Sequence, residues 1–146
     1  MPAGARIRAS FPRPDRATLA AFAGVSACDA ADALGRLAVV DPAIHRMSGQ
    51  GILVGPALPV LCRPDDNLMV HAAIDLAQPG DVIVISAGGG TQTALVGELV
   101  SSWAKARGVA GFVIDGAIRD VDALQVPTFA RGPSPRAPFK LSLIHI

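Results

Sequence analysis

Residues 81–86 read DVIVIS and residues 111–115 read GFVID, and these two runs decide the fold class. Each is short and almost continuously apolar, which is typical of a strand covered on both faces of a parallel sheet. Residues 94–107 lie between the two runs, and Lys105 and Gly108 stand where a helix favours a cation and a left-handed cap. We therefore expect a helix over residues 94–107. A strand, a helix and a second strand in succession predict an α/β fold.

The stretches on either side continue this alternation. Helices are predicted over residues 17–36, with a break at Gly24, and over residues 67–77, where apolar residues recur at helical spacing. Short apolar runs predict strands over residues 51–61 and 126–130. This order of elements is that of one α/β domain.

Three stretches are expected to lie outside regular structure. Residues 41–47 are interpreted as a linker, residues 88–90 (GGG) as a loop, and Gly116 as the turn that ends the second apolar run and leads into residues 118–124. The glycine loop is a weak indication of phosphate binding, because the sixth position of its G-x-G-x-x-G pattern is Thr93 and no P-loop lysine follows.

Length and composition exclude several classes of protein. The chain has 146 residues, of which 51% are hydrophobic, with 13 Lys and Arg against 12 Asp and Glu. This hydrophobicity excludes a disordered chain, and the balanced charge predicts no nucleic-acid partner. No apolar run reaches the ~18–20 residues of a membrane helix, so no membrane partner is expected. Cys28 and Cys62 could form one disulfide, but we favour two free thiols in a cytoplasmic protein.

Composition also predicts how the chain is divided. Residues 1–16 are rich in Ala, Pro and Arg and are expected to form a flexible arm, whereas the domain itself is expected over residues 17–140. Residues 141–146 (LSLIHI) have no turn, helix cap or charge that links them to the domain. We therefore expect them to be a non-native tail, with the natural sequence continuing differently after Lys140.

Candidate functional residues lie near the carboxyl ends of the predicted strands, where α/β folds usually bind ligands. Glu98 lies early in the helix predicted over residues 94–107, and Arg119 and Asp120 follow the second apolar run. Taken singly, each has an ordinary structural explanation: a carboxylate that pairs with the helix dipole, or a solvated ion pair at the surface. Twenty residues separate Glu98 from the Arg-Asp pair.

Several stretches together match one known family. They are residues 32–36 (DALGR), 55–60 (GPALPV), 66–67 (DN) followed by HAA from His71, 79–84 (PGDVIV), 97–99 (GEL) and 108–120 (GVAGFVIDGAIRD). From about residue 17 to residue 138 the chain resembles the RraA-like family, which includes the class II 4-hydroxy-4-methyl-2-oxoglutarate aldolases. The aldolase signature is an acidic residue, twenty positions and then Arg-Asp, and this chain has Glu98 where the best-understood aldolases have Asp.

The resemblance implies a fold and an assembly. Members form a compact swivelling β/β/α domain that assembles into trimers or hexamers, with the active site shared between subunits. They also continue past the position of Lys140 with strands that complete the sheet. On this resemblance we expect a homo-oligomer, and we expect the chain to lack its final strands.

The resemblance also implies an activity: divalent-metal-dependent cleavage of 4-hydroxy-4-methyl-2-oxoglutarate-type 2-oxo acids, and decarboxylation of oxaloacetate, with release of pyruvate. Asp120 would bind Mg²⁺ or Mn²⁺, and Glu98 would orient the metal or its water. Arg119 would bind the developing enolate oxygen. Backbone N–H groups at Gly97, Leu99 and Val100 would bind the substrate carboxylate.

Two other functions remain open at this point. Some members of the family bind and inhibit ribonuclease E without catalysis, and a metal-binding domain with another substrate is also compatible with the residues. The acidic residue at position 98 favours catalysis, although Asp would favour it more strongly. Of the remaining polar residues, His71 is interpreted as a packed side chain rather than a metal ligand, and Asn67 as a helix cap.

Overall fold

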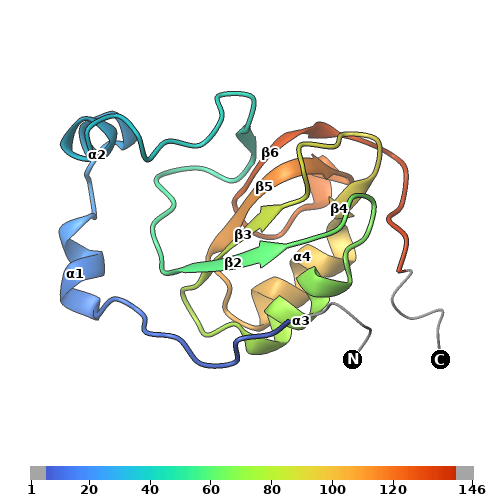
Figure 1. The fold of residues 1–146 in the computed structure, drawn as a ribbon, viewed down its shortest axis with the longest axis horizontal. Helices are drawn as coiled ribbons and strands as arrows, with labels where there is room; N and C mark the ends of the chain where they lie inside the picture. Colours follow the sequence, from blue (N-terminus) through green and yellow to red (C-terminus); the bar gives the residue numbers. More distant parts are fainter. Residues whose placement is uncertain (1–5, 141–146) are drawn as a thin grey trace.

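The computed structural model describes residues 6–140, which form one α/β domain around a single mixed sheet (Figure 1). The tail predicted over residues 141–146 lies outside the described residues, as do the first five residues of the predicted arm. Within residues 6–140, no helix is both long and apolar enough to span a membrane.

Six strands build the sheet in the order β1-β6-β5-β3-β2, and β4 pairs with the end of β5. Among the strand pairs of residues 6–140, β1 and β6 alone pair antiparallel, and the others are parallel. Parallel neighbours need crossover connections, which the helices provide. The strands are β1 (His45–Ser48), β2 (Ala57–Leu61), β3 (Val82–Ser86), β4 (Ala94–Val96), β5 (Gly111–Ile118) and β6 (Thr128–Pro133).

Helices α3 and α4 pack together under the sheet, whereas α1 and α2 lie beyond its edge (Figure 1). The apolar faces of the sheet and of α3 and α4 enclose the core, which includes Phe112, Ile114, Ile83 and Ile74, all with at most 1% exposure. The helices are α1 (Arg16–Ala21), α2 (Ala27–Ala33), α3 (Leu68–Leu76) and α4 (Glu98–Ala106), with a short 3-10 turn, η1 (Val121–Ala123).

The helix predicted over residues 94–107 is wrong at its start. Residues 94–96 are all buried and form β4, which pairs with β5. Gly97 then lies in extended backbone, and helix α4 begins at Glu98. Helical spacing cannot separate a buried three-residue strand from the first turn of the helix that follows it.

The turn predicted at Gly116 is also wrong, because β5 runs through this residue to Ile118. The packing here is close: a Cβ at this position would lie 3.1 Å from Leu95 Cδ1, so the Leu95 side chain would have to shift. The predicted linker over residues 41–47 contains the start of β1, and of the predicted strand 51–61 only the part after Pro56 forms β2.

Candidate functional site

The pair Arg119–Asp120 follows β5 directly. The Arg119 N–H donates to the Val96 carbonyl (3.0 Å), so pairing with β4 continues one residue beyond the strand. Asp120 then adopts a left-handed conformation, with φ 52° and ψ 44°, which aspartate tolerates better than most side chains. The chain turns there, and Asp120 Oδ2 lies 3.4 Å from Arg119 Nε.

The turn between β4 and α4 meets this pair. The Glu98 N–H donates to Asp120 Oδ2 (3.2 Å), which ties the first residue of α4 to the end of β5. A Cβ at Gly97 would lie 2.8 Å from both Arg119 Cγ and Asp120 Oδ2, so this approach requires glycine. The structure thus brings together Gly97, Glu98, Arg119 and Asp120, which the sequence had singled out from two separate stretches.

A cavity of about 40 Å³ adjoins this cluster, enough for a group the size of one or two water molecules. Leu99 and Val100 line it from the first turn of α4, where backbone N–H groups have no partner within the helix. Helical bonding begins one residue later, since the Ser101 N–H donates to the Gly97 carbonyl (3.0 Å). The helix start therefore presents donors suited to an anionic group. The other lining residues include Asn67, Leu95, Gly97, Arg119 and Pro138.

The donor chemistry of this cluster fits a hard divalent cation. Over residues 6–140, no three His, Cys, Asp or Glu side chains gather in a way that could hold a metal. A metal here would rest on Asp120 and Glu98 together with water. Mg²⁺ takes oxygen ligands, often only one or two carboxylates, and keeps several waters. The side chains of Arg119 and Asp120 are 38% and 43% exposed, which leaves room for a solvated ion.

A family model described as "RraA-like: Aldolase/RraA" matches residues 26–144. The chain belongs to the RraA-like family.

Curated relatives of this RraA-like chain carry an aldolase name. A protein of Halalkalibacterium halodurans, named "Putative 4-hydroxy-4-methyl-2-oxoglutarate aldolase", is 42% identical over 118 residues, which cover 79% of this chain and 56% of the relative. A protein of the same name from Paraburkholderia phytofirmans is 36% identical over 126 residues, covering 82% of this chain and 76% of the relative. This chain thus spans little more than half the length of the first relative.

Two solved structures share the RraA-like fold of this chain. The RNA-processing inhibitor RraA from Thermus thermophilis matches with a TM-score of 0.71 and 24% identity, over 80% of this chain and 72% of that one. RraAS2 of Streptomyces coelicolor, described as an unusual member of the RNase ES inhibitor RraA protein family, matches with a TM-score of 0.74 and 29% identity, over 86% and 68%. The fold predicted from the resemblance is confirmed.

A larger groove of about 500 Å³ lies elsewhere on the sheet of this RraA-like chain. At its polar end, Arg131 Nε donates to Asp115 (2.5 Å) and Arg131 Nη2 to Asp41 (2.8 Å). Hydrogen bonds from the Ala43 N–H and from Arg131 lower the pKa of Asp41. Sequence reasoning missed this network because its members are 16 and 90 residues apart. We place the candidate site at Arg119 and Asp120, because the N–H groups at the start of α4 adjoin that pair.

The predictions for two other polar residues, His71 and Asn67, have different outcomes. The His71 ring packs against Trp103, with 5.5 Å between centroids, so the prediction of a packed histidine is confirmed. Asn67 stands at the N-cap position of α3, as predicted, but its side chain makes no cap bond. Asp66 accepts the Leu68 N–H instead (2.8 Å). Asn67 instead reaches β4, where its Nδ2 donates to the Leu95 carbonyl (3.0 Å).

Proposed function

We propose that this RraA-like chain forms the catalytic part of a divalent-metal-dependent aldolase. It would cleave 4-hydroxy-4-methyl-2-oxoglutarate-type 2-oxo acids, decarboxylate oxaloacetate and release pyruvate in both reactions. The observation that carries this proposal is the junction at Asp120, where one carboxylate contacts the Glu98 N–H and the Arg119 side chain. The aldolase names of the two relatives support the same reaction.

The reaction requires stabilisation of a negative charge. When the C3–C4 bond of a 4-hydroxy-2-oxo acid breaks, its electron pair passes to the 2-oxo group and forms the enolate of pyruvate. The 4-hydroxyl loses its proton and becomes the carbonyl of the second product, and C3 then takes up a proton. Donors held beside the oxygen that becomes negative lower this barrier, and the Arg119 guanidinium would supply them.

Three groups of this chain would bind and orient the substrate. The N–H groups of the Gly97–Val100 turn would hold its carboxylate, and Arg119 its 2-oxo oxygen. Glu98 would position a water that carries the proton. Mg²⁺ or Mn²⁺, held by Asp120 and through water by Glu98, would supply Lewis-acid withdrawal of charge from the 2-oxo acid.

The assembly is inferred from the family resemblance, and the location from the cysteines. We propose a trimer or hexamer in the cytoplasm. The described structure has two free cysteines, exposed Cys28 and buried Cys62, which suits a reducing compartment.

A second function is also proposed, because of the likeness to one solved structure. Because RraAS2, 29% identical, is described within an RNase inhibitor family, the chain is also a candidate for binding and inhibiting a ribonuclease.

The deciding experiment measures pyruvate release from 4-hydroxy-4-methyl-2-oxoglutarate and from oxaloacetate, with Mg²⁺ and with a chelator. Arg119→Ala should lower kcat by roughly 10²–10³, the scale for losing one oxyanion donor. Arg36→Ala, which removes an exposed arginine of the α2 region, is the matched control and should leave kcat unchanged. If the folded protein releases no pyruvate with Mg²⁺ present, the aldolase proposal fails, and inhibition of a ribonuclease becomes the reaction to measure.

Two variants separate the roles of the carboxylates. Asp120→Ala should abolish activity together with its dependence on metal, so Mg²⁺-stimulated turnover in this variant would refute the ligand role. Glu98→Asp restores the residue of the best-understood aldolases and should preserve or raise activity. Loss of activity in Glu98→Asp would instead show that the longer side chain is required here.

A further inference from the structure

Strand β4 carries one extra residue where it pairs with β5. The paired residues are Ala94 with Ala117 and Val96 with Ile118. Two steps along β4 therefore match one step along β5, and Leu95 is the inserted residue of a bulge. A bulge leaves its extra residue outside the hydrogen-bonded ladder and redirects the chain that follows. Here the chain that follows is Gly97 and the start of α4.

Asn67 binds the backbone of this bulge. Its side-chain Nδ2 donates to the Leu95 carbonyl (3.0 Å) across 28 residues of sequence. Asn67 itself is only 3% exposed. Its own helix does not need this side chain, because Asp66 accepts the Leu68 N–H at the start of α3. The amide of Asn67 is therefore committed to the bulge.

The oxygen of the same side-chain amide, Asn67 Oδ1, argues against a purely structural role. A carbonyl only accepts, so Leu95 fixes the nitrogen toward itself and leaves Oδ1 on the other side. Over the described residues, Oδ1 is buried and has no hydrogen-bond partner. Such a buried acceptor costs about 1–3 kcal/mol. Stability alone would favour a side chain without that oxygen.

We propose that Asn67 is a positioning residue of the candidate active site: by fixing Leu95 in the bulge, it sets the separation between the N–H groups of the Gly97–Val100 turn and the Arg119 guanidinium. Asn67, Leu95, Gly97 and Arg119 line the same small cavity. A substrate bound to both groups reacts only when they are correctly spaced. The kinetic part of this inference rests on the proposed function, and its structural part does not.

Two substitutions of similar size test the role of the Nδ2 donor. Asn67→Leu removes the donor, and Asn67→Asp places an acceptor against the Leu95 carbonyl. At pH 8 each should lower kcat by roughly 10²-fold, the cost of misplacing a reacting group by about 1 Å, with a smaller change in KM. A protonated carboxyl can donate, so the activity of Asn67→Asp relative to the parent should recover as the pH falls, whereas that of Asn67→Leu should not.

Thr93→Val is the matched control. Thr93 is 2% exposed, and its Oγ1 is also buried without a partner among the described residues, but it does not line the cavity. This variant should leave kcat within about twofold of the parent value. Among the described residues the Thr93 hydroxyl makes no hydrogen bond, so its removal releases no neighbouring group. If Thr93→Val and Asn67→Leu lower kcat equally, burial of a polar group explains both effects and the inference is overturned.

Amide hydrogen exchange without substrate tests the structural part independently. Asn67→Leu should accelerate exchange of the Glu98 and Ser101 amides, whose N–H groups are hydrogen-bonded in the turn, by at least about tenfold, while the amides of β5 remain protected, because only the local bond is lost. Unchanged exchange at Glu98 and Ser101, or equal loss of protection across β5, would overturn the inference. If the parent protein releases no pyruvate, the proposed function fails, and this exchange result alone decides the role of Asn67.

Discussion

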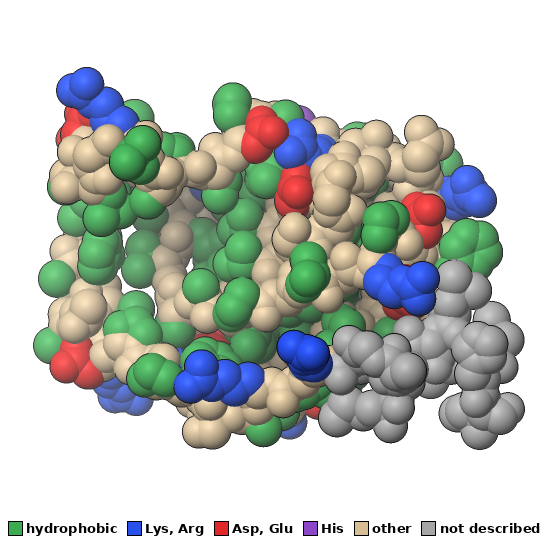
Figure 2. Space-filling view, in the orientation of Figure 1, with side chains coloured by type: hydrophobic (Ala, Val, Ile, Leu, Met, Phe, Trp, Pro, Cys, Tyr) green, Lys and Arg blue, Asp and Glu red, His purple; other side chains and the backbone are tan. Residues whose placement is uncertain are grey.

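Residues 6–55 and residues 56–140 of this chain are stabilised in different ways. In the first region no described residue is buried, whereas the second contains every residue of the core. Figure 1 shows α1 and α2 of the first region apart from the sheet, and Figure 2 shows hydrophobic side chains at the surface there. The exposed large apolar residues of this region include Phe22, Leu34, Leu37, Val39, Val40 and Ile52.

In the first region, side-chain caps rather than burial mark where the helices begin. Asp15 Oδ1 accepts the Thr18 N–H (2.7 Å) at the start of α1, and Ser26 Oγ accepts the Asp29 N–H (3.1 Å) at the start of α2. Such caps are worth about 1 kcal/mol each, and helices of this length are marginal alone. Local signals therefore decide where α1 and α2 begin, while the core decides whether the domain is stable.

The largest effect should come from removing a core side chain in the second region. Phe112 in β5 is 0% exposed, so Phe112→Ala should lower the free energy of unfolding by about 4 kcal/mol through lost burial and a residual cavity. The matched substitution in the first region is Phe22→Ala, which changes an exposed side chain and should cost within about 0.5 kcal/mol. Denaturant titration measures both. Similar losses would show that α1 contributes to the same cooperative unit.

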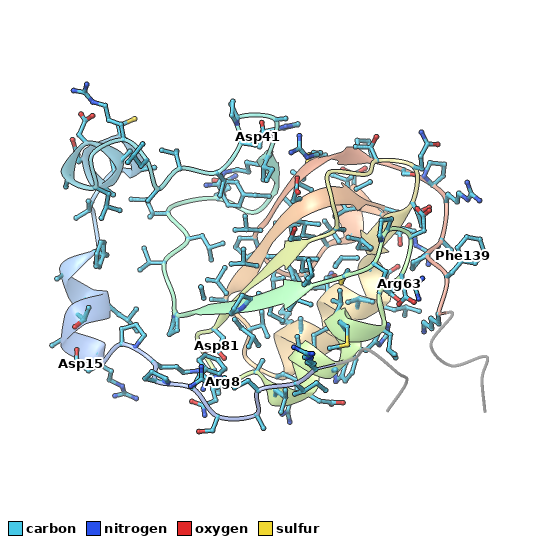
Figure 3. All side chains as sticks on the ribbon, viewed as in Figure 1. Arg8, Asp15, Asp41, Arg63, Asp81 and Phe139 are labelled. Carbon is cyan, nitrogen blue, oxygen red and sulfur yellow. The ribbon has the colours of Figure 1, made fainter. Side chains whose placement is uncertain are left out.

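The next effect tests the link between the regions. Arg13 Nε and Nη2 donate to the two carboxylate oxygens of Asp81 (2.9 and 2.8 Å), and Asp81 is 1% exposed. Figure 3 places Asp81 where the N-terminal segment passes the sheet. Arg13→Ala leaves this buried carboxylate without its cation and should lower the free energy of unfolding by about 3 kcal/mol.

Arg16→Ala is the control for that substitution, because Arg16 is exposed in α1. It should leave the unfolding midpoint in urea unchanged. Equal midpoints for Arg13→Ala and the parent would show that the segment before α1 is not held by Asp81, which is what the prediction of a flexible arm over residues 1–16 implies.

Much of the second region could be predicted from sequence. The apolar runs of β3 and β5 and the helix over α3 follow from patterns that burial produces directly. The β4 strand and the full length of β5 could not be predicted, since both depend on the pairing of β4 with β5, which no local pattern records. The single-domain α/β prediction is confirmed, but its boundaries depend on tertiary packing.

The candidate site likewise has one part that could be predicted from sequence and one part that could not. The family resemblance indicated that Glu98 and Arg119–Asp120 belong together, and the structure brings them into contact. The roles predicted for them stay predictions. The bond from Asn67 to Leu95 could not be predicted, because a residue after Asp66 at a helix start has the local pattern of a cap. Only the position of the bulge in β4 shows what this amide does.

The reactivity of the two cysteines also distinguishes the two regions. Cys28 is exposed in α2, and Cys62 is buried after β2, where burial and then the charge of Asp66 raise the pKa of the thiol to about 11. At pH 8 roughly one Cys62 in a thousand is a thiolate, the form that reacts. Alkylation by iodoacetamide, followed by peptide mass spectrometry, should therefore label Cys28 while Cys62 stays unmodified. Labelling of both at similar rates would mean that the core around Cys62 opens readily.

The smallest effect is expected at His71. This residue is half-buried, so it extends the comparison to the margin of the core in the second region. Burial first, and then the positive charge of Lys140, lower the pKa of His71 below its usual value near 6.5. The unfolded chain therefore binds this proton before the folded protein does. The stabilisation from neutral His71 is complete above about pH 6.5 and is lost as the pH falls toward the folded pKa.

Fluorescence of the single tryptophan, Trp103, reports unfolding beside this ring. His71→Gln should flatten the fall in unfolding free energy between about pH 7 and 5, whereas His45→Gln, at an exposed position in β1, should leave its slope unchanged. Equal slopes for His71→Gln and the parent would place the acid sensitivity of the domain outside the contact between α3 and α4.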